Sequence, residues 1–379
     1  MANDLDLMDE DFPIRRPTEA GRAALLPGTL TKASSDQELV ALWLRRPNLS
    51  ADTLRAGAKE AARFLMWCAA HHVGLREVRY EHLVAYSEFL DNPRPADQWI
   101  APAKYRRDDP RWRPFCGRLQ PKSQLQALII LKGLFAWAKA AGYLNADPSR
   151  LLGRLSPGLP TTIERYLPQS AIPYLLTACA NLPSATACEE LRKARITFSV
   201  MAYYSTATRL RELVTAQMSS FQQNEHSQWW LHIIGKGSRA GKVPVAQELI
   251  DALKTYRSAF GLPPLPAPNE ALPLLLSTRG KQRAISARVA ARNLQTIFKA
   301  AAKQASTEGK HHLAARMENA STHWLRHSQL THQADAGVPL KSIQLNGRHA
   351  DISTAGLYQH REESARHAET VAIPIIPRE

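Results

Sequence analysis

Apolar residues recur at helical spacing along most of this chain and predict a largely α-helical protein. The clearest run covers residues 50–71, where Leu54, Ala58 and Ala61 follow Ser50, a suitable N-cap, at intervals of three or four. Residues at this spacing share one face of a helix, so the run predicts an amphipathic helix. The same pattern predicts helices at residues 36–44, 50–71, 78–90, 123–141, 169–180, 188–205, 247–260, 286–304, 323–336 and 340–345, and a final helical turn that carries Tyr358.

One short segment follows a strand pattern instead. Trp229–Ile234 is rich in aromatic and β-branched residues, the following GKGSRAG suits a turn, and Lys242–Val245 can return as a second strand. The predicted fold class is therefore mostly α with a small β-hairpin, which makes the second half of the chain an α+β arrangement.

A stretch near the middle of the chain, residues 149–168, is rich in Pro, Gly and Arg and lacks periodicity, as is typical of a linker. It separates two regions that are each long enough to form a core. The predicted organisation is a flexible tail (1–33), a helical domain (34–148), the linker (149–168), an α+β domain (169–360) and a C-terminal tail (361–379) with an apolar strip at 371–376.

The charge balance adds a partner to this picture. The 379 residues carry a formal net charge of +15, which favours a polyanion, and nucleic acid is the commonest one. The four cysteines are scattered without a C-x-x-C pair, so neither a disulfide framework nor a zinc site is expected. No apolar run reaches membrane-spanning length and the start of the chain is acidic, so we expect a cytoplasmic, nucleoid-associated protein without a membrane partner.

Basic side chains are concentrated in the long segment between two predicted helices, residues 92–121. They alternate with Tyr105, Trp112 and Phe115, and such mixtures suit contacts with phosphate and sugar. The alternative is a solvated loop that Trp112 and Phe115 pin to its domain. The residues predicted to bind DNA here are Lys104, Arg106, Arg107, Arg111, Arg113, Arg118 and Lys122.

Candidate chemistry lies near the end of the chain. His323, Arg326 and His327 are spaced i, i+3 and i+4, so their side chains share one face of the predicted helix. Two imidazoles beside a guanidinium pack poorly in a core but bind anions well. His349 and Tyr358 follow, and the combination suggests a phosphodiester site with a tyrosine nucleophile.

A phosphodiester site needs further positive charge, and two upstream segments supply it. The stretch YYSTATRLRELVTAQ contains Arg209 and Glu212, and the hairpin turn GKGSRAGK contains Lys236, Arg239 and Lys242. The hairpin is not a phosphate-binding P-loop, because that motif needs a glycine where Lys236 stands and a Ser or Thr where Val243 stands. Arg239 and Lys242 are predicted to contact DNA.

Together these segments resemble the boxes of the tyrosine recombinases, the phage integrase family. TATRLREL resembles the family's T-G-x-R-x-x-E-L box, IGKGSRAGKVPV its lysine hairpin, HWLRH its H-x-x-R-H box, and LNGRHADISTAGLY its L-G-H-x-x-x-x-T-x-x-x-Y close. The boxes occur in the family's order over roughly 150 residues. Two departures stand out: Ala207 replaces the glycine before Arg209, and Arg348 separates Gly347 from His349.

The resemblance implies a role for each residue of the boxes. Tyr358 would attack the scissile phosphate and form a 3′-phosphotyrosyl bond. His323 would take its proton, because a phenol with a pKa of about 10 is protonated at neutral pH. Arg209 and Arg326 would hold the non-bridging oxygens and offset the charge of the transition state.

The remaining roles follow from the same resemblance. Lys236 would give a proton to the departing 5′-oxygen, with Lys242 as its rival. His349 would donate a hydrogen bond to the phosphate, Glu212 would support the site, and His327 is interpreted as a structural neighbour. No metal or other cofactor is expected, since guanidiniums and a lysine supply the positive charge. A zinc site formed by His323 and His327 is disfavoured because Trp324 stands where zincins have glutamate.

The family also implies an overall activity. The N-terminal helices would form a core-binding, SAM-like domain, which closes with the catalytic domain as a C-shaped clamp around double-stranded DNA with inverted-repeat core sites. Four protomers would exchange strands through a Holliday junction, each docking its 361–379 tail on a neighbour, without ATP, with or without a partner recombinase or accessory protein. The reaction would serve a mobile element or replicon. The alternatives are a strand transferase of the type IB topoisomerase kind and an inactive DNA-binding protein.

Overall fold

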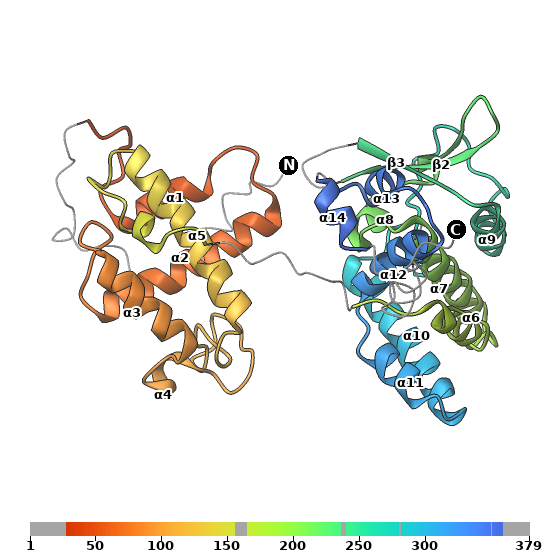
Figure 1. Ribbon diagram of the computed structural model, residues 1–379, viewed down its shortest axis with the longest axis horizontal. Coiled ribbons are helices and arrows are strands. Elements are labelled where there is room, and N and C mark those ends of the chain that lie inside the picture. The colour runs from red at the N-terminus through yellow and green to blue at the C-terminus, as the bar shows by residue number, and fades with distance from the viewer. Residues whose placement is uncertain (1–27, 156–164, 236–239, 280–281, 350, 359–379) are drawn as a thin grey trace, which may run out of the picture. The chain divides into compact units, whose positions relative to one another are not determined.

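The computed structural model describes residues 28–155, 165–235, 240–279, 282–349 and 351–358. The chain divides into two compact units, residues 1–159 and 160–379, and the division falls inside the segment predicted as a linker (Figure 1). The first residues of that segment belong to a 3₁₀ helix, η2 (Pro148–Leu152), which contacts the helices α3 (Tyr80–Asp91) and α5 (Pro121–Ala140) of the first unit. The fold class, mostly α with a small sheet, is confirmed.

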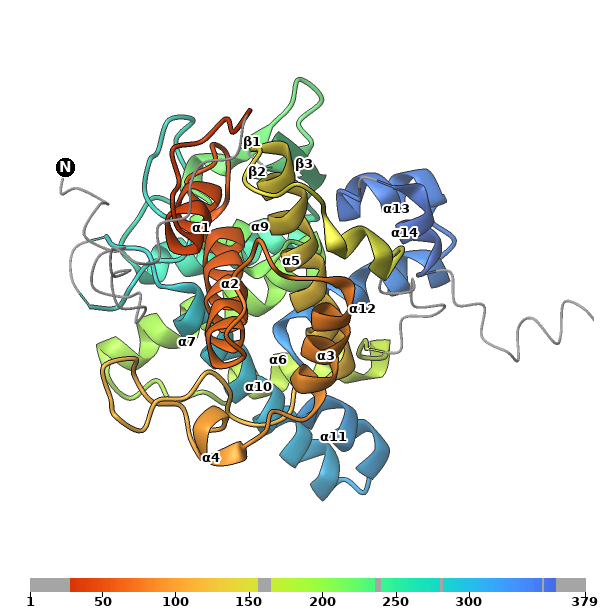
Figure 2. The ribbon, with the colours of Figure 1, turned by 90° about the vertical axis from the view of Figure 1, so that its left-hand side faces the viewer.

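The first unit is a helical domain. Its helices are α1 (Asp36–Leu44), α2 (Ala51–Ala70), α3 (Tyr80–Asp91), α4 (Ala96–Trp99) and α5 (Pro121–Ala140). Helix α2 begins where predicted, because the Ser50 side chain accepts the N–H of Thr53 at 3.1 Å. Figure 2 shows α1, α2, α3 and α5 gathered around one core, in which Phe64 meets Tyr86 and Phe135 edge to face.

Two details of this unit differ from the sequence prediction. The tail was expected to extend through residue 33, but Leu30 N–H donates to Ala141 O at 2.8 Å and Ala33 is buried. Part of the segment predicted as tail is therefore attached to the domain, although Leu30 is 83% exposed. Helix α4 interrupts the basic loop and was not predicted, because four residues are too few for a helical period to be read.

The second unit combines helices with a three-stranded antiparallel sheet of order β1-β2-β3 in its described residues. It is built from η3 (Gln169–Ala171), α6 (Ile172–Ala180), α7 (Ala187–Thr206), α8 (Leu210–Thr215), η4 (Met218–Ser220), β1 (Phe221–Gln223), β2 (Trp229–Ile234), β3 (Ala240–Pro244), α9 (Gln247–Ala259), α10 (Ala287–Thr307), α11 (His311–Glu318), α12 (Thr322–Asp335), α13 (Leu340–Gly347) and α14 (Ile352–Gly356).

The predicted hairpin is present, with corrections. Strand β3 begins at Ala240, two residues before the prediction, and β1 adds a third strand that pairs Phe221 with Leu231. The helical turn expected to carry Tyr358 ends at Gly356, so the tyrosine follows α14 instead. Helices α8 and α11 were not predicted, because both are short and their apolar faces become evident only against the core.

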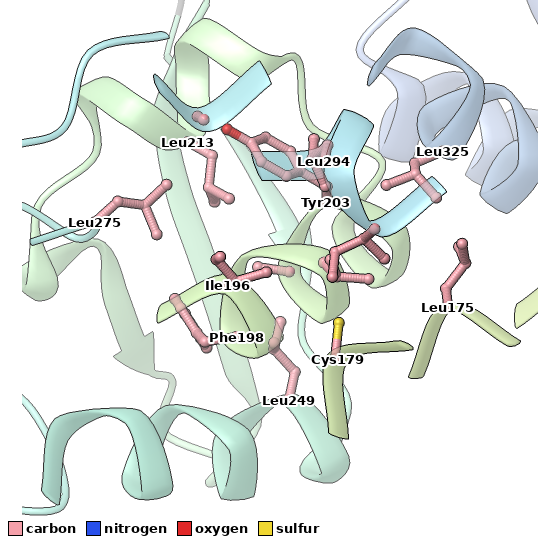
Figure 3. Close-up of a cluster of buried hydrophobic side chains, with 14 of the residues drawn as sticks. Leu175, Cys179, Ile196, Phe198, Tyr203, Leu213, Leu249, Leu275, Leu294 and Leu325 are labelled. Carbon is pink, nitrogen blue, oxygen red and sulfur yellow. The ribbon is translucent and has the colours of Figure 1, made fainter. Parts of the chain in front are cut away.

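The core of this unit fixes the helices that carry the site. Figure 3 shows side chains from α6, α7, α9 and α10 meeting, with Ile196 and Phe198 of α7 among them and Leu325 of α12 at one side. A smaller cluster joins Ala207, Leu330, Ile343 and Tyr358, and so ties the end of α7 to α12, α13 and the final turn. None of the helices in the described ranges is long and apolar enough to cross a membrane.

Candidate active site

Helix α12 contributes the residues of the predicted cationic face. His323 and His327 lie one turn apart, with their rings edge to face and 4.4 Å between centroids. Arg326 is 2% exposed, whereas the His323 side chain is exposed. The helix therefore turns one guanidinium inward while His323 faces solvent.

Arg326 is a buried cation surrounded by neutral acceptors. It donates hydrogen bonds to the carbonyl oxygens of Ala207 and Gly347, and its Nη2 lies 3.1 Å from His349 Nε2. No carboxylate in the described part of the chain forms an ion pair with it. Burial and the nearby charges of Arg209 and Arg348 lower its pKa to about 10. A buried charge without a counterion is costly, so this one is suited to an anion that arrives from outside.

Two backbone turns around Arg326 have left-handed geometry without glycine. Ala207, at the end of α7, has φ 49°, and Arg348, at the end of α13, has φ 49° and ψ 47°. Left-handed backbone costs a non-glycine residue roughly 1 kcal/mol. These are the two departures from the family boxes: Ala207 replaces a glycine, and Arg348 follows one. Both turns form nonetheless, and the Ala207 carbonyl oxygen accepts a hydrogen bond from Arg326.

Arg209 and Glu212 form a compact pair at the start of α8. Arg209 Nη1 donates to Glu212 Oε1 at 2.9 Å, and the Arg209 backbone N–H donates to Oε2 at 2.6 Å. The Arg209 side chain remains 40% exposed while that of Glu212 is 5% exposed. The carboxylate thus orients a guanidinium that solvent, or a phosphate, can reach.

Tyr358 is buried next to these groups, with only 1% of its surface exposed. Its hydroxyl lies 2.9 Å from His327 Nδ1, and its ring stacks on that of His349, with 5.6 Å between centroids and 3° between planes. Burial raises the pKa of the Tyr358 hydroxyl, and the neighbouring guanidiniums of Arg326 and Arg209 oppose that rise. The phenol is therefore protonated at neutral pH.

The histidines beside Tyr358 are neutral in this state. Burial, followed by the charges of neighbouring residues, lowers the pKa of His327 to about 3 and that of His349 to about 4. Since arginine only donates, His349 accepts the Arg326 hydrogen bond at Nε2 and carries its proton on Nδ1. That Nδ1 has no hydrogen-bond partner among the described residues, so it is a donor available for another group.

Of the three basic residues predicted to act in the hairpin, the structure describes Lys242. Lys236 and Arg239 lie outside the described residues, and their roles stay predictions. Lys242, on β3, is exposed, and its Nζ lies 4.5 Å from the centroid of the Trp230 ring. Its role as DNA contact or rival lysine also stays a prediction.

The basic loop of the first unit is partly neutralised by its own carboxylates. Arg106 pairs with Asp108 at 3.3 Å and Arg111 with Asp109 at 2.9 Å, while Arg113 donates to three backbone carbonyls. Phe115 is buried, as expected for a residue that pins the loop. DNA contact by the loop stays a prediction; its exposed cations are Lys104, Arg106, Arg111, Arg118 and Lys122, and Arg107 and Arg113 are half-buried.

Two residues have a larger part in this geometry than the sequence indicated. His327, interpreted as a structural neighbour, is the residue in hydrogen-bond contact with the Tyr358 hydroxyl. Arg348, noted only as a departure from the family pattern, forms an ion pair with Glu212. The spacing of His327 from His323 was a usable signal, whereas nothing local to Arg348 indicates a partner 136 residues earlier in the chain.

Residues of three of the four predicted boxes thus lie around one buried guanidinium, that of Arg326, which contacts Ala207, Gly347 and His349. The family model named Phage integrase family matches residues 165–365, more than half of the chain. The chain belongs to the phage integrase family. Within the described residues, no group of three or more His, Cys, Asp and Glu side chains could hold a metal ion.

Individual relatives agree with this assignment. Tyrosine recombinase XerD of Vibrio cholerae is 25% identical over 325 residues, which cover 86% of this chain and 90% of XerD. Tyrosine recombinase XerC of Salmonella typhi is 28% identical over 242 residues, 64% of this chain and 70% of XerC.

Solved structures share the fold. The XerH site-specific recombinase bound to palindromic difH substrate matches with a TM-score of 0.61 at 17% identity, over 90% of this chain and 85% of that one. The Tn1549 transposon integrase in complex with circular intermediate DNA matches with a TM-score of 0.57 at 16% identity, over 89% and 99%.

The depressed histidine pKa values predict a pH-dependent stability. In the unfolded chain His327 has a pKa near 6.5, so unfolding below that pH takes up a proton that the folded site excludes. The contribution of His327 is therefore complete above pH 6.5 and is lost as the pH falls toward about 3.

We expect the free energy of unfolding to fall between pH 7 and pH 5. The slope of this free energy against pH measures the number of protons taken up on unfolding, and this number should be smaller by about one in His327→Asn. Urea unfolding of the full chain at pH 7, 6 and 5 measures both slopes. Identical slopes in wild type and variant would show that His327 titrates normally in the folded protein.

Proposed function

We propose that this protein is a site-specific DNA recombinase that cuts and rejoins strands through a 3′-phosphotyrosyl intermediate. The observation that carries the proposal is a buried guanidinium, that of Arg326, which has no carboxylate partner among the described residues and contacts His349, whose ring stacks on that of Tyr358. A tyrosine beside an uncompensated cation can attack a phosphodiester, whose charge the cation then balances.

The two arginines would bind the scissile phosphate. Arg209 is partly exposed and oriented by Glu212, and Arg326 is held by two carbonyl oxygens and His349. A phosphate between them would accept charge-assisted hydrogen bonds from both guanidiniums. The free Nδ1–H of His349 would supply a further donor.

The nucleophile would be activated by the neighbouring imidazoles. His327 Nδ1 is within hydrogen-bond distance of the Tyr358 hydroxyl, so we assign the first proton transfer to His327, with His323 beside it as a second imidazole. The His327 pKa is lowered by burial and by neighbouring positive charge. A bound phosphate would offset that charge and raise the pKa, so the base gains strength only with DNA in place.

Attack by Tyr358 Oη on phosphorus forms the phosphotyrosyl bond and breaks the bond to the 5′-oxygen, which Lys236 would protonate. The freed 5′-hydroxyl of a partner strand then reverses the step, and no energy source is consumed. The chemistry would need no metal, because the positive charges of the site stabilise the transition state.

Recombination, as distinct from strand cleavage, would need two DNA sites and four protomers that form a Holliday junction. The relatives named tyrosine recombinases and the XerH and Tn1549 structures in complex with DNA support recombination on DNA, while the four protomers and the junction rest on the family resemblance alone. We propose that the helical unit grips the duplex through the basic loop and that the site serves a mobile element or replicon, alone or with a partner recombinase.

A plasmid assay tests the proposal. Plasmids carry two copies of a DNA fragment from the protein's own locus, and the protein is added in EDTA. We expect excised circles and protein–DNA adducts that resist SDS. A control plasmid carries no cloned fragment. If the protein relaxes this supercoiled plasmid and yields no recombinants from the two-site plasmids, the topoisomerase alternative is indicated. DNA binding without adducts on any locus fragment would indicate an inactive binder.

A further inference from the structure

Arg348 has an unfavourable, left-handed backbone conformation, and its side chain is largely buried. It caps α13 with φ 49° and ψ 47°, a geometry that glycine adopts without strain. Its side chain is only 12% exposed and reaches Glu212 Oε2 with Nη2. The Nε and Nη1 atoms are buried and have no partner among the described residues.

The neighbouring strand leaves room for this side chain. A Cβ atom at Gly241, in β3, would lie 2.7 Å from Arg348 Cδ, closer than atoms can approach. Strand β3 contacts α13, and Figure 1 shows the two elements side by side. Three segments, β3, the end of α13 and α8, therefore meet at the Arg348 side chain.

The contact between Arg348 and Glu212 changes the net charge of the site. Glu212 receives hydrogen bonds from Arg209 and from Arg348, so two guanidiniums share one carboxylate. With Arg326, the three arginines and Glu212 leave two net positive charges. Without Arg348, Glu212 would balance Arg209 and only one would remain. A phosphodiester has one negative charge, and attack by a phenolate adds a second in the transition state.

We propose that Arg348 is a positioning residue that takes up the charge of Glu212, so that Arg209 and Arg326 are both available to the doubly charged transition state. The inference rests on the proposed strand-transfer function. It assigns to Arg348 an effect on the rate of cleavage rather than on DNA affinity, because the charge is needed most when the second negative charge develops.

Arg348→Gly tests this inference without straining the fold, since glycine suits the left-handed turn. On DNA with the site mapped by covalent capture, we expect the variant to bind nearly as wild type and to form the adduct about 10- to 100-fold more slowly at saturating DNA. Arg348→Lys, which keeps the charge, should recover most of the rate.

A substrate change separates charge from structure. When a neutral methylphosphonate replaces the scissile phosphate, the transition state carries one negative charge fewer. The deficit of Arg348→Gly relative to wild type should then shrink to about threefold or less. An equal deficit on both substrates would overturn the charge-sharing role, and so would a wild-type rate in Arg348→Gly on the normal substrate. Absence of an adduct with wild type would instead contradict the proposed function.

Gly241→Ala supplies an independent check. In the wild-type background the added methyl displaces Arg348, so adduct formation should slow by a factor similar to that of Arg348→Gly. In the Arg348→Gly background the same change should have no further effect, because no side chain is left to displace. Equal slowing in both backgrounds would overturn the inferred contact.

Discussion

Tyr358→Phe is expected to abolish covalent attachment to DNA and to lower strand cleavage at least about 1,000-fold, to the limit of detection. The variant lacks the only atom that the proposed mechanism uses as nucleophile. DNA binding should persist, because the phenyl ring keeps the stacking on His349 and the packing against Leu330 and Ile343. Gel shift and SDS-resistant adduct formation on the same DNA fragment measure both properties.

Tyr256→Phe is the matched control. Tyr256 is also 1% exposed in the second unit, and its hydroxyl accepts one hydrogen bond, from Leu276 N–H at 2.8 Å. Both changes remove one buried hydroxyl and should cost about 1 kcal/mol of stability. Only Tyr358→Phe should lose adduct formation. Residual adduct with Tyr358→Phe at more than a trace would assign the nucleophile to another residue.

Arg326→Lys is expected to lower adduct formation at least about 100-fold although the positive charge is kept. The guanidinium reaches Ala207 O, Gly347 O and His349 at once, whereas a lysine ammonium is a point donor that cannot hold all three and bind a phosphate in two places. A buried carbonyl that loses its donor costs about 1–3 kcal/mol, so the folded protein should also lose stability of that order.

A loss of stability alone would not slow adduct formation this much. Arg257→Lys is the control that separates the two effects. Arg257 is fully buried in the same unit, holds Glu270 through two hydrogen bonds of 2.8 and 3.0 Å, and lies outside the proposed site. Arg257→Lys should lower the unfolding midpoint while adduct formation at 20 °C stays within about threefold of wild type. Similar cleavage rates in the two lysine variants would remove Arg326 from the phosphate site.

The resting geometry suggests why the protein would not react with stray phosphodiesters. Tyr358 is buried and protonated, and the bases near it are weakened by burial and by neighbouring cations. Under the proposed mechanism, entry of a scissile phosphate would offset the positive charge and strengthen the bases at the same time. We infer that DNA binding and nucleophile activation are coupled through electrostatics.

The sequence revealed the parts of the site whose signals are local. The spacing of His323, Arg326 and His327 indicates one helix face. In α12 the two histidine rings lie edge to face as this predicts, although Arg326 is buried and His323 is exposed. The long helices and the hairpin strand Trp229–Ile234 were also predictable, because their periodicity extends over enough residues to be read.

What the sequence could not show depends on contacts between distant segments. His327 meets Tyr358 31 residues later, and Arg348 meets Glu212 136 residues earlier, so neither contact leaves a periodic trace. The left-handed turns at Ala207 and Arg348 contradict local preference, because glycine is the usual residue there. Tertiary contacts that involve Arg326 and Glu212 hold both turns in place.

The central claim is that Tyr358 becomes linked to DNA, and its most direct test is to locate the linkage. The adduct with wild-type protein is trapped, digested with nuclease and trypsin, and sequenced by mass spectrometry. Residues 349–361 contain one tyrosine and form a single tryptic peptide. We predict that this peptide carries a nucleotide through a 3′-phosphate on Tyr358. A nucleotide on any other residue, with peptide 349–361 unmodified, would contradict the account.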